Sequence, residues 1–100
     1  MFIHNVYFWL KNDLEDRELT EIEQGLQSLC EIKLVKSGYF GKPADTNRAV
    51  IDSSYNYGLV LFFDDKTGQD AYQVGNVHQK FIADHSAKWE RVLVYDFEAE

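Results

Sequence analysis

The stretch YGLVLFFDD, residues 57–65, decides the fold of this chain. Successive side chains of a strand point to opposite faces. Apolar residues fall on both faces here: Tyr57, Leu59, Leu61 and Phe63 on one, Val60 and Phe62 on the other. A strand that is apolar on both faces must be covered on both faces. We therefore expect a strand at about residues 55–64 that is enclosed on both sides.

The rest of the chain supplies three more strands and three helical segments, read from the same periodicities. The expected strands are residues 2–11, 33–41 and about 89–98, and the expected helices are about 15–30, 66–74 and about 77–85. Residues 42–54 hold the only proline among turn-forming residues and are expected to form a loop.

This order of elements is βαββαβ, the ferredoxin-like arrangement of the α+β class. Right-handed crossovers would place the first and third strands at the centre of a four-stranded antiparallel sheet. A chain of 100 residues is expected to form a single domain, residues 1–100.

Several residues predict where the helices begin and end. Asp13 is expected to begin the first helix, with Asp16 three residues later as a weak capping box. Gly75 suits the end of the second helix, and Asn76 can cap the third. His85, near the end of that third helix, is expected to face solvent.

One face of the predicted sheet has no partner within the chain. The helical segments can cover only the other face, yet apolar side chains point to both. The uncovered members are Tyr7, Trp9, Val60 and Phe62. Contiguous apolar surface of this kind indicates an interface. We therefore predict a homodimer that forms through this face of the sheet.

Composition excludes some partners and suggests a location. The formal net charge of −7 disfavours binding to nucleic acid and to anionic membranes. No apolar run is long enough to span a bilayer. The single cysteine, Cys30, cannot form an internal disulfide, which fits a cytoplasmic protein.

Two residues that can exchange protons flank a break in AYQVGNVHQKF, residues 71–81. Tyr72 precedes Gly75-Asn76 and His78 follows it, and the reference pKa values are about 10 for tyrosine and about 6.5 for histidine. Taken alone, His78 fits a hydrogen-bonded core histidine better than a catalytic group, and Tyr72 fits a core aromatic equally well. His4, on the first strand, reads more readily as a core histidine.

Four stretches in the same order resemble the Dabb family of dimeric stress-responsive α/β-barrel domain proteins. They are IHNVYFWLK (3–11), YGLVLFFDD (57–65), AYQVGNVHQKF (71–81) and VLVYDFE (92–98). The resemblance covers essentially the whole chain. It implies a ferredoxin-like fold in which two subunits pack sheet against sheet as a dimeric α/β barrel.

One member of that family, olivetolic acid cyclase, closes a polyketide ring without a cofactor. By resemblance, Tyr72 and His78 fall on its catalytic tyrosine and histidine, and His4 on a pocket histidine. Tyr57 stands in place of a third pocket histidine. The resemblance therefore implies catalytic roles for His78 and Tyr72 and substrate binding by His4, Tyr57 and Phe81. No cofactor is expected, and no metal, because the three histidines lack ligand spacing.

Two functions follow as predictions. The first is a stress-responsive homodimer with a pocket for a small apolar ligand, whose specific activity the sequence leaves unassigned. The alternative is a cofactor-independent cyclase or lyase in which His78 and Tyr72 perform acid/base chemistry on a small, polyketide-like carbonyl compound. A cavity that reaches His78 favours the alternative, whereas a solid core around it favours the first.

Overall fold

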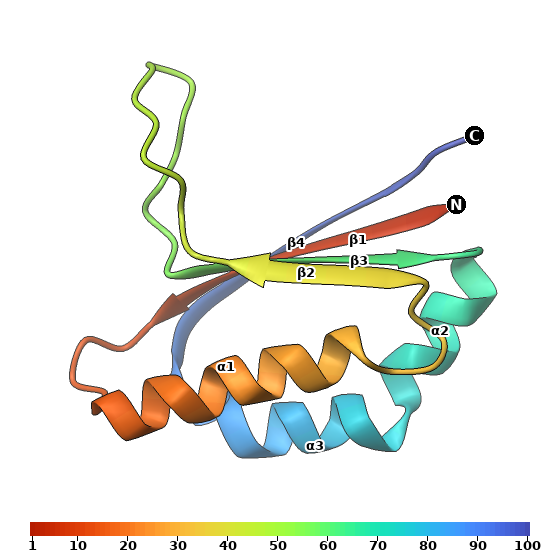
Figure 1. Cartoon of the computed structure of the whole chain (residues 1–100), viewed down its shortest axis with the longest axis horizontal. Helices are drawn as coiled ribbons and strands as arrows, with labels where there is room; N and C mark the ends of the chain where they lie inside the picture. The colour runs from red at the N-terminus through yellow and green to blue at the C-terminus, as the bar shows by residue number, and fades with distance from the viewer.

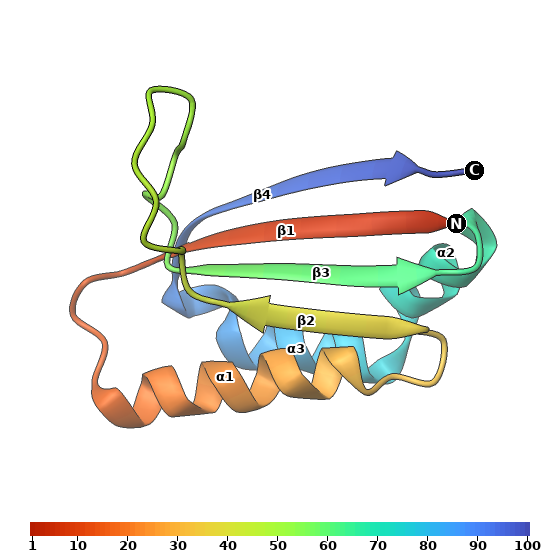
Figure 2. The ribbon, with the colours of Figure 1, turned by 45° about the horizontal axis from the view of Figure 1, so that its top comes forward.

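Four antiparallel strands form one layer of the computed structural model, which describes all 100 residues. They are β1 (Phe2–Leu10), β2 (Ser37–Gly41), β3 (Tyr57–Phe63) and β4 (Trp89–Glu98). Their order across the sheet is β2-β3-β1-β4, visible in Figure 2. β1 and β3 are therefore the central pair, as predicted.

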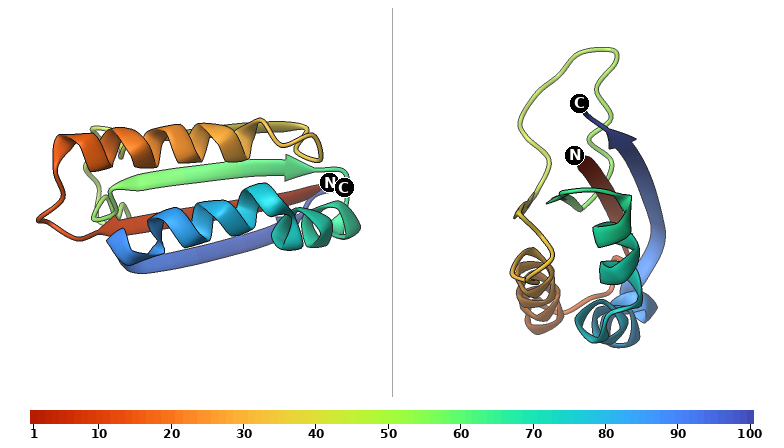
Figure 3. Two further views of the ribbon diagram at one scale, coloured as in Figure 1. Left: turned by 90° about the horizontal axis from the view of Figure 1, so that it is seen from below. Right: turned by 90° about the vertical axis from the view of Figure 1, so that its right-hand side faces the viewer.

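The helices form the second layer, on one face of the sheet. They are α1 (Asp16–Cys30), α2 (Lys66–Val74) and α3 (Asn76–His85), and a 3-10 turn (Ser86–Lys88) leads into β4. Figure 3 shows α1 and α3 side by side beneath the strands. The loop between β2 and β3 rises on the opposite side (Figure 1). The predicted ferredoxin-like βαββαβ fold is confirmed.

The core lies between the two layers. Even-numbered residues of β1 and odd-numbered residues of β3 face the helices, as alternation requires. Leu61 from β3 and Leu26 from α1 are completely buried there. Burying leucine side chains of this kind contributes about 1.5–3 kcal/mol each, so this layer contact dominates the stability of the fold.

Three predicted boundaries were wrong. The second strand begins at Ser37, because residues 31–36 make a turn in which the Val35 N–H bonds the Ile32 carbonyl. The first helix is capped by Glu15 instead of Asp13, and the Glu18 side chain accepts the Glu15 N–H at 3.1 Å. Asn76 is already the first residue of α3, so it does not cap that helix.

The face of the sheet away from the helices carries the predicted apolar strip. Tyr7, Trp9, Val60 and Phe62 are all half-buried there. Neighbouring aromatic residues on the same face are more exposed: Tyr39 at 65%, Tyr95 at 59% and Phe97 at 54%. Apart from the loop between β2 and β3, no element of the chain covers this face (Figure 3). The open surface is thus larger and more aromatic than the sequence indicated.

Candidate functional site

A cavity of about 140 Å³ lies between the sheet and the helices. Its lining comes from β1, β3, β4 and all three helices and is mostly apolar. Four of the five predicted site residues line it: His4, Tyr72, His78 and Phe81. The folded chain therefore brings these residues together around one space.

The polar rings of this cavity come from three different elements. His4 lies on central strand β1, Tyr72 in the last turn of α2 and His78 in the first turn of α3. Gly75 separates the two helices, and its N–H bonds the Tyr72 carbonyl. The Tyr72 ring is 4.9 Å from the His78 ring and 6.0 Å from the His4 ring, centroid to centroid. All three side chains are more than nine-tenths buried.

His4 is held by a carboxylate that the sequence analysis missed. Asp96 on β4 lies directly opposite His4 in the strand register, and its Oδ1 is 2.5 Å from His4 Nδ1. A carboxylate accepts hydrogen bonds, so Nδ1 carries the proton and donates. In neutral His4 the other nitrogen, Nε2, is then an acceptor. Only the register between two distant strands could have revealed this pair.

His78 is oriented by two glutamines of α2. The Gln69 side-chain amide donates to Gln73 Oε1 at 3.0 Å, which turns the Gln73 amide nitrogen toward His78 Nε2 at 3.4 Å. An amide nitrogen is a donor, so His78 Nε2 accepts and Nδ1 carries the proton. Nδ1 is buried and has no partner in the protein.

The pKa values of the two central rings are set mainly by burial. Burial lowers the pKa of His78, since desolvation disfavours the charged imidazolium. Burial also raises the pKa of Tyr72. At neutral pH His78 is therefore an uncharged imidazole and Tyr72 a protonated phenol. Both can donate a hydrogen bond to an oxygen in the cavity.

Trp89, at the start of β4, is a further cavity residue that the sequence analysis did not single out. Its ring is 5.8 Å from Phe81 and 5.3 Å from Phe8. The indole Nε1 is buried without a hydrogen-bond partner. The sequence alone does not indicate that a tryptophan at the start of a strand has an unpaired indole N–H.

Tyr57 lies outside this cavity. Its side chain faces the helix layer, as expected, but the hydroxyl donates to Glu23 Oε2 on α1 at 2.5 Å. Burial and this carboxylate raise the pKa of Tyr57. It borders a separate hollow near Pro43. Its role in substrate binding stays a prediction, which the position of the ring does not favour.

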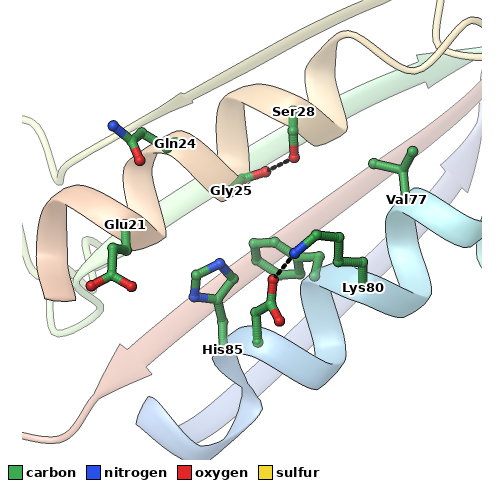
Figure 4. A pocket seen from close by; sticks show the side chains of 9 residues that line it. Glu21, Gln24, Gly25, Ser28, Val77, Lys80 and His85 are labelled. Carbon is green, nitrogen blue, oxygen red and sulfur yellow. Dashed lines mark hydrogen bonds and ion pairs between the residues drawn. The ribbon is translucent and has the colours of Figure 1, made fainter.

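A larger groove of about 580 Å³ runs between α1 and α3 on the outer side of the helix layer (Figure 4). It contains His85, which was wrongly expected to face solvent and is only 7% exposed. The ring fits because Gly25 on α1 has no side chain. Lys88 lies 3.3 Å from His85 Nδ1, and burial together with this cation lowers the pKa of His85. Its position near the end of a helix suggested exposure, but Gly25 on the facing helix leaves room for the ring to be buried.

The substitution Gly25→Ala is expected to destabilise the protein. The added Cβ would lie 2.7 Å from His85 Nε2 and 3.0 Å from Phe81 Cδ1. Overpacking of this kind costs about 1–3 kcal/mol. Replacing a glycine by alanine inside a helix stabilises the helix by about 1 kcal/mol, which offsets part of this cost. Urea unfolding should therefore show a net loss.

Gly25→Ala in a His85→Ala background tests whether the His85 ring causes this loss of stability. There the ring is gone and Phe81 can move aside, so only the gain in helix propensity remains. Gly25→Ala should then stabilise. An equal loss in both backgrounds would show that the His85 ring is not the obstacle.

Two further observations concern membrane-spanning helices and metal ligands. No helix combines the length and the hydropathy that a bilayer crossing requires. No group of three or more histidine, cysteine, aspartate or glutamate side chains is placed to hold a metal ion.

Comparison with known proteins identifies the family. Residues 2–99 match the family model described as Dabb, the Stress responsive A/B Barrel Domain. The chain belongs to the Dabb family. No curated protein matches it. The resemblance predicted from four sequence stretches is therefore confirmed, while a specific relation to olivetolic acid cyclase stays a prediction.

Solved structures share the fold of this Dabb protein. A Dabb family protein with a ferredoxin-like fold from Mesorhizobium loti is 22% identical, with a TM-score of 0.78 and coverage of 99% of this chain and 96% of that one. A dimeric ferredoxin-like protein of unknown function from Thermobifida fusca is 18% identical, with a TM-score of 0.79 and coverage of 98% and 90%.

A third solved structure with this fold is the hydroxynitrile lyase from Passiflora edulis. It is 17% identical, with a TM-score of 0.81 and coverage of 99% of the Dabb chain and 93% of the lyase. Identities this low establish the shared fold and not a shared activity.

Proposed function

We propose that this Dabb protein is a homodimer whose subunits each bind a compact, mainly apolar molecule that carries an oxygen. The dimer would form through the open face of the sheet around Val60. The half-buried strip and its exposed aromatic neighbours support this, as does the description of the Thermobifida fusca protein as dimeric. The family description and the lone Cys30 support a stress-related role in the cytoplasm.

The cavity carries the proposal for ligand binding. Apolar lining with a few convergent polar groups is typical of small-molecule sites. A dry apolar cavity of about 150 Å³ takes up benzene. The volume of about 140 Å³ found here therefore suits a single ring or a short branched chain. An extended polyketide would not fit within one subunit.

A second candidate function is a cofactor-independent lyase or cyclase that acts on a small carbonyl compound. It is supported by the His4–Asp96 pair and by the lyase that shares the fold. Tyr72 and His78 would donate hydrogen bonds to the substrate oxygen, which stabilises developing negative charge. His4 Nε2 is the acceptor that remains for a proton, since His78 Nε2 faces Gln73. His4 would then act as the base, while Tyr72 and the uncharged His78 would serve as hydrogen-bond donors to the substrate oxygen.

Binding of benzaldehyde, measured by titration calorimetry, tests the cavity proposal. Tyr72→Phe removes one hydroxyl from the cavity and should weaken binding about tenfold, because a lost hydrogen bond costs about 1–1.5 kcal/mol. Tyr57→Phe removes a tyrosine hydroxyl that lies outside the cavity and should leave binding unchanged. Failure of the wild-type protein to bind, or equal losses in both variants, would refute the proposal.

Turnover tests the second candidate separately. Mandelonitrile, the cyanohydrin of benzaldehyde, should release benzaldehyde faster in the presence of the protein, as followed by ultraviolet absorbance. His4→Phe should abolish the acceleration while circular dichroism stays unchanged. Binding without any acceleration would leave a ligand-binding protein that is not a lyase of this type.

A further inference from the structure

The chain contains only two buried side-chain nitrogen or oxygen atoms without a hydrogen-bond partner, namely His78 Nδ1 and Trp89 Nε1. Both residues line the same cavity. Buried polar groups in folded proteins are nearly always hydrogen-bonded, so each exception calls for an explanation. Two exceptions at one cavity point to a shared cause.

Both atoms are donors. The indole nitrogen of tryptophan can only donate. His78 Nδ1 carries a proton because the Gln69–Gln73 relay turns an amide nitrogen toward the other ring nitrogen. A bound molecule that meets both donors must therefore offer two acceptors.

A second subunit on the open face would not supply these acceptors. Trp89 pairs with Leu10 in the strand register, and Leu10 belongs to the face of β1 that packs against the helices. His78 lies on α3, within the helix layer. A molecule in the cavity is the remaining source of acceptors, since both residues line that cavity.

An aromatic wall separates the two donors. Phe81 follows His78 by one helical turn, and its ring is 5.8 Å from Trp89. Phe8 also contacts both Phe81 and Trp89. The cavity therefore has a polar end at Tyr72 and His78, an apolar middle, and one isolated donor at Trp89.

We infer that the ligand is a single-ring carbonyl compound with a second oxygen on the far side of the ring, of which a para-hydroxylated aromatic aldehyde is the simplest example. The carbonyl oxygen would face Tyr72 and His78, and the ring oxygen would accept from Trp89. Trp89 then determines specificity. This inference rests on the proposed binding function and names the class of ligand.

Other ligand classes fit less well. A hydrocarbon would leave both donors unpaired in a buried place. A carboxylate would bring a charge into a lining that contains no lysine or arginine, and such burial is costly without a partner. A neutral molecule with two separated oxygens satisfies both donors.

Two probes of nearly equal size test the inference in the unmodified protein. 4-Hydroxybenzaldehyde has the second oxygen, and 4-methylbenzaldehyde replaces it with a methyl group. Calorimetry should show about fivefold to tenfold tighter binding of the hydroxyl compound, the value of one hydrogen bond. Trp89→Phe keeps an aromatic ring but removes the donor, so it should abolish this preference and bring the ratio of the two affinities to about one.

The outcomes distinguish the role of Trp89 from ligand binding in general. Equal affinity for both probes in the wild-type protein overturns the role of Trp89 and leaves the binding proposal intact. A preference that survives in a folded Trp89→Phe protein also overturns it. Failure of both probes to bind refutes the binding proposal itself.

Discussion

A glutamate in place of Val60 is expected to convert the proposed dimer into a monomer. Val60 lies on central strand β3 and points away from the helices, between Asn5 on β1 and Tyr39 on β2. Burying an ionised carboxylate against apolar neighbours without a partner costs more than burying an uncharged polar group, which itself costs roughly 2–7 kcal/mol. A symmetric interface doubles the effect, because both subunits carry the charge.

Matched substitutions at the same position isolate the cause. Val60→Thr keeps the branched shape without a charge and should remain dimeric, and Val60→Lys should dissociate like the glutamate. Trp9 is a poorer choice, since Arg91 lies 4.5 Å from its ring and would pair with a new carboxylate. Sedimentation at micromolar concentration measures the result. A wild-type monomer, or a Val60→Glu dimer, would contradict the proposed interface.

The central strands were predictable because their hydrophobic pattern allows few alternatives. Alternation in residues 57–63 assigns Leu61 to one face and Val60 to the other, and a shift by one residue would expose the whole core set. Handedness then placed β1 and β3 in the middle. Local pattern and topology agreed, so the fold followed without knowledge of any relative.

The ends of helices and strands, and the burial of single side chains, were harder to predict because they depend on contacts between distant segments. Residues 33–36 have strand-forming composition, yet they belong to the turn after α1. Val35 is buried in that turn, and the pairing of β2 with β3 begins only after it. The His85 ring on α3 can be buried because the residue that faces it on α1 is Gly25, which has no side chain. Neither fact is encoded within a window of neighbouring residues.

Some residues of the candidate site could likewise be predicted from local sequence, whereas others could not. Tyr72 and His78 are close in sequence, so a helix break between them was enough to predict that they could meet. Asp96 and Trp89 come from the last strand, and Asp96 is 92 residues away from His4 in sequence. Their positions opposite His4 and Leu10 follow from the register of β1 with β4, which the sequence does not specify by itself.

Removing the Asp96 carboxylate is expected to destabilise the protein and to loosen its site. A hydrogen bond to a charged group contributes about 1.5–3 kcal/mol, and its loss leaves the buried His4 Nδ1–H without an acceptor. The Asp96 side chain is 37% exposed, so water replaces part of the interaction. We therefore expect Asp96→Ala to lower the free energy of unfolding by about 1.5–3 kcal/mol. Asp96→Asn, whose oxygen can still accept, should cost less.

A double-mutant cycle with His4→Phe distinguishes this pairing from a general effect on β4. Phenylalanine has no Nδ1 donor, so in that background Asp96→Ala should cost almost nothing, and the coupling should be about 1.5–3 kcal/mol. Asp96 acts on ligands only through His4, whose ring it holds against Tyr72. Asp96→Ala should thus slow any mandelonitrile cleavage more than it weakens benzaldehyde binding, since binding uses the donors Tyr72 and His78 and proton transfer uses His4. Equal costs of Asp96→Ala with and without His4 would show that the carboxylate stabilises the strand and does not position the histidine.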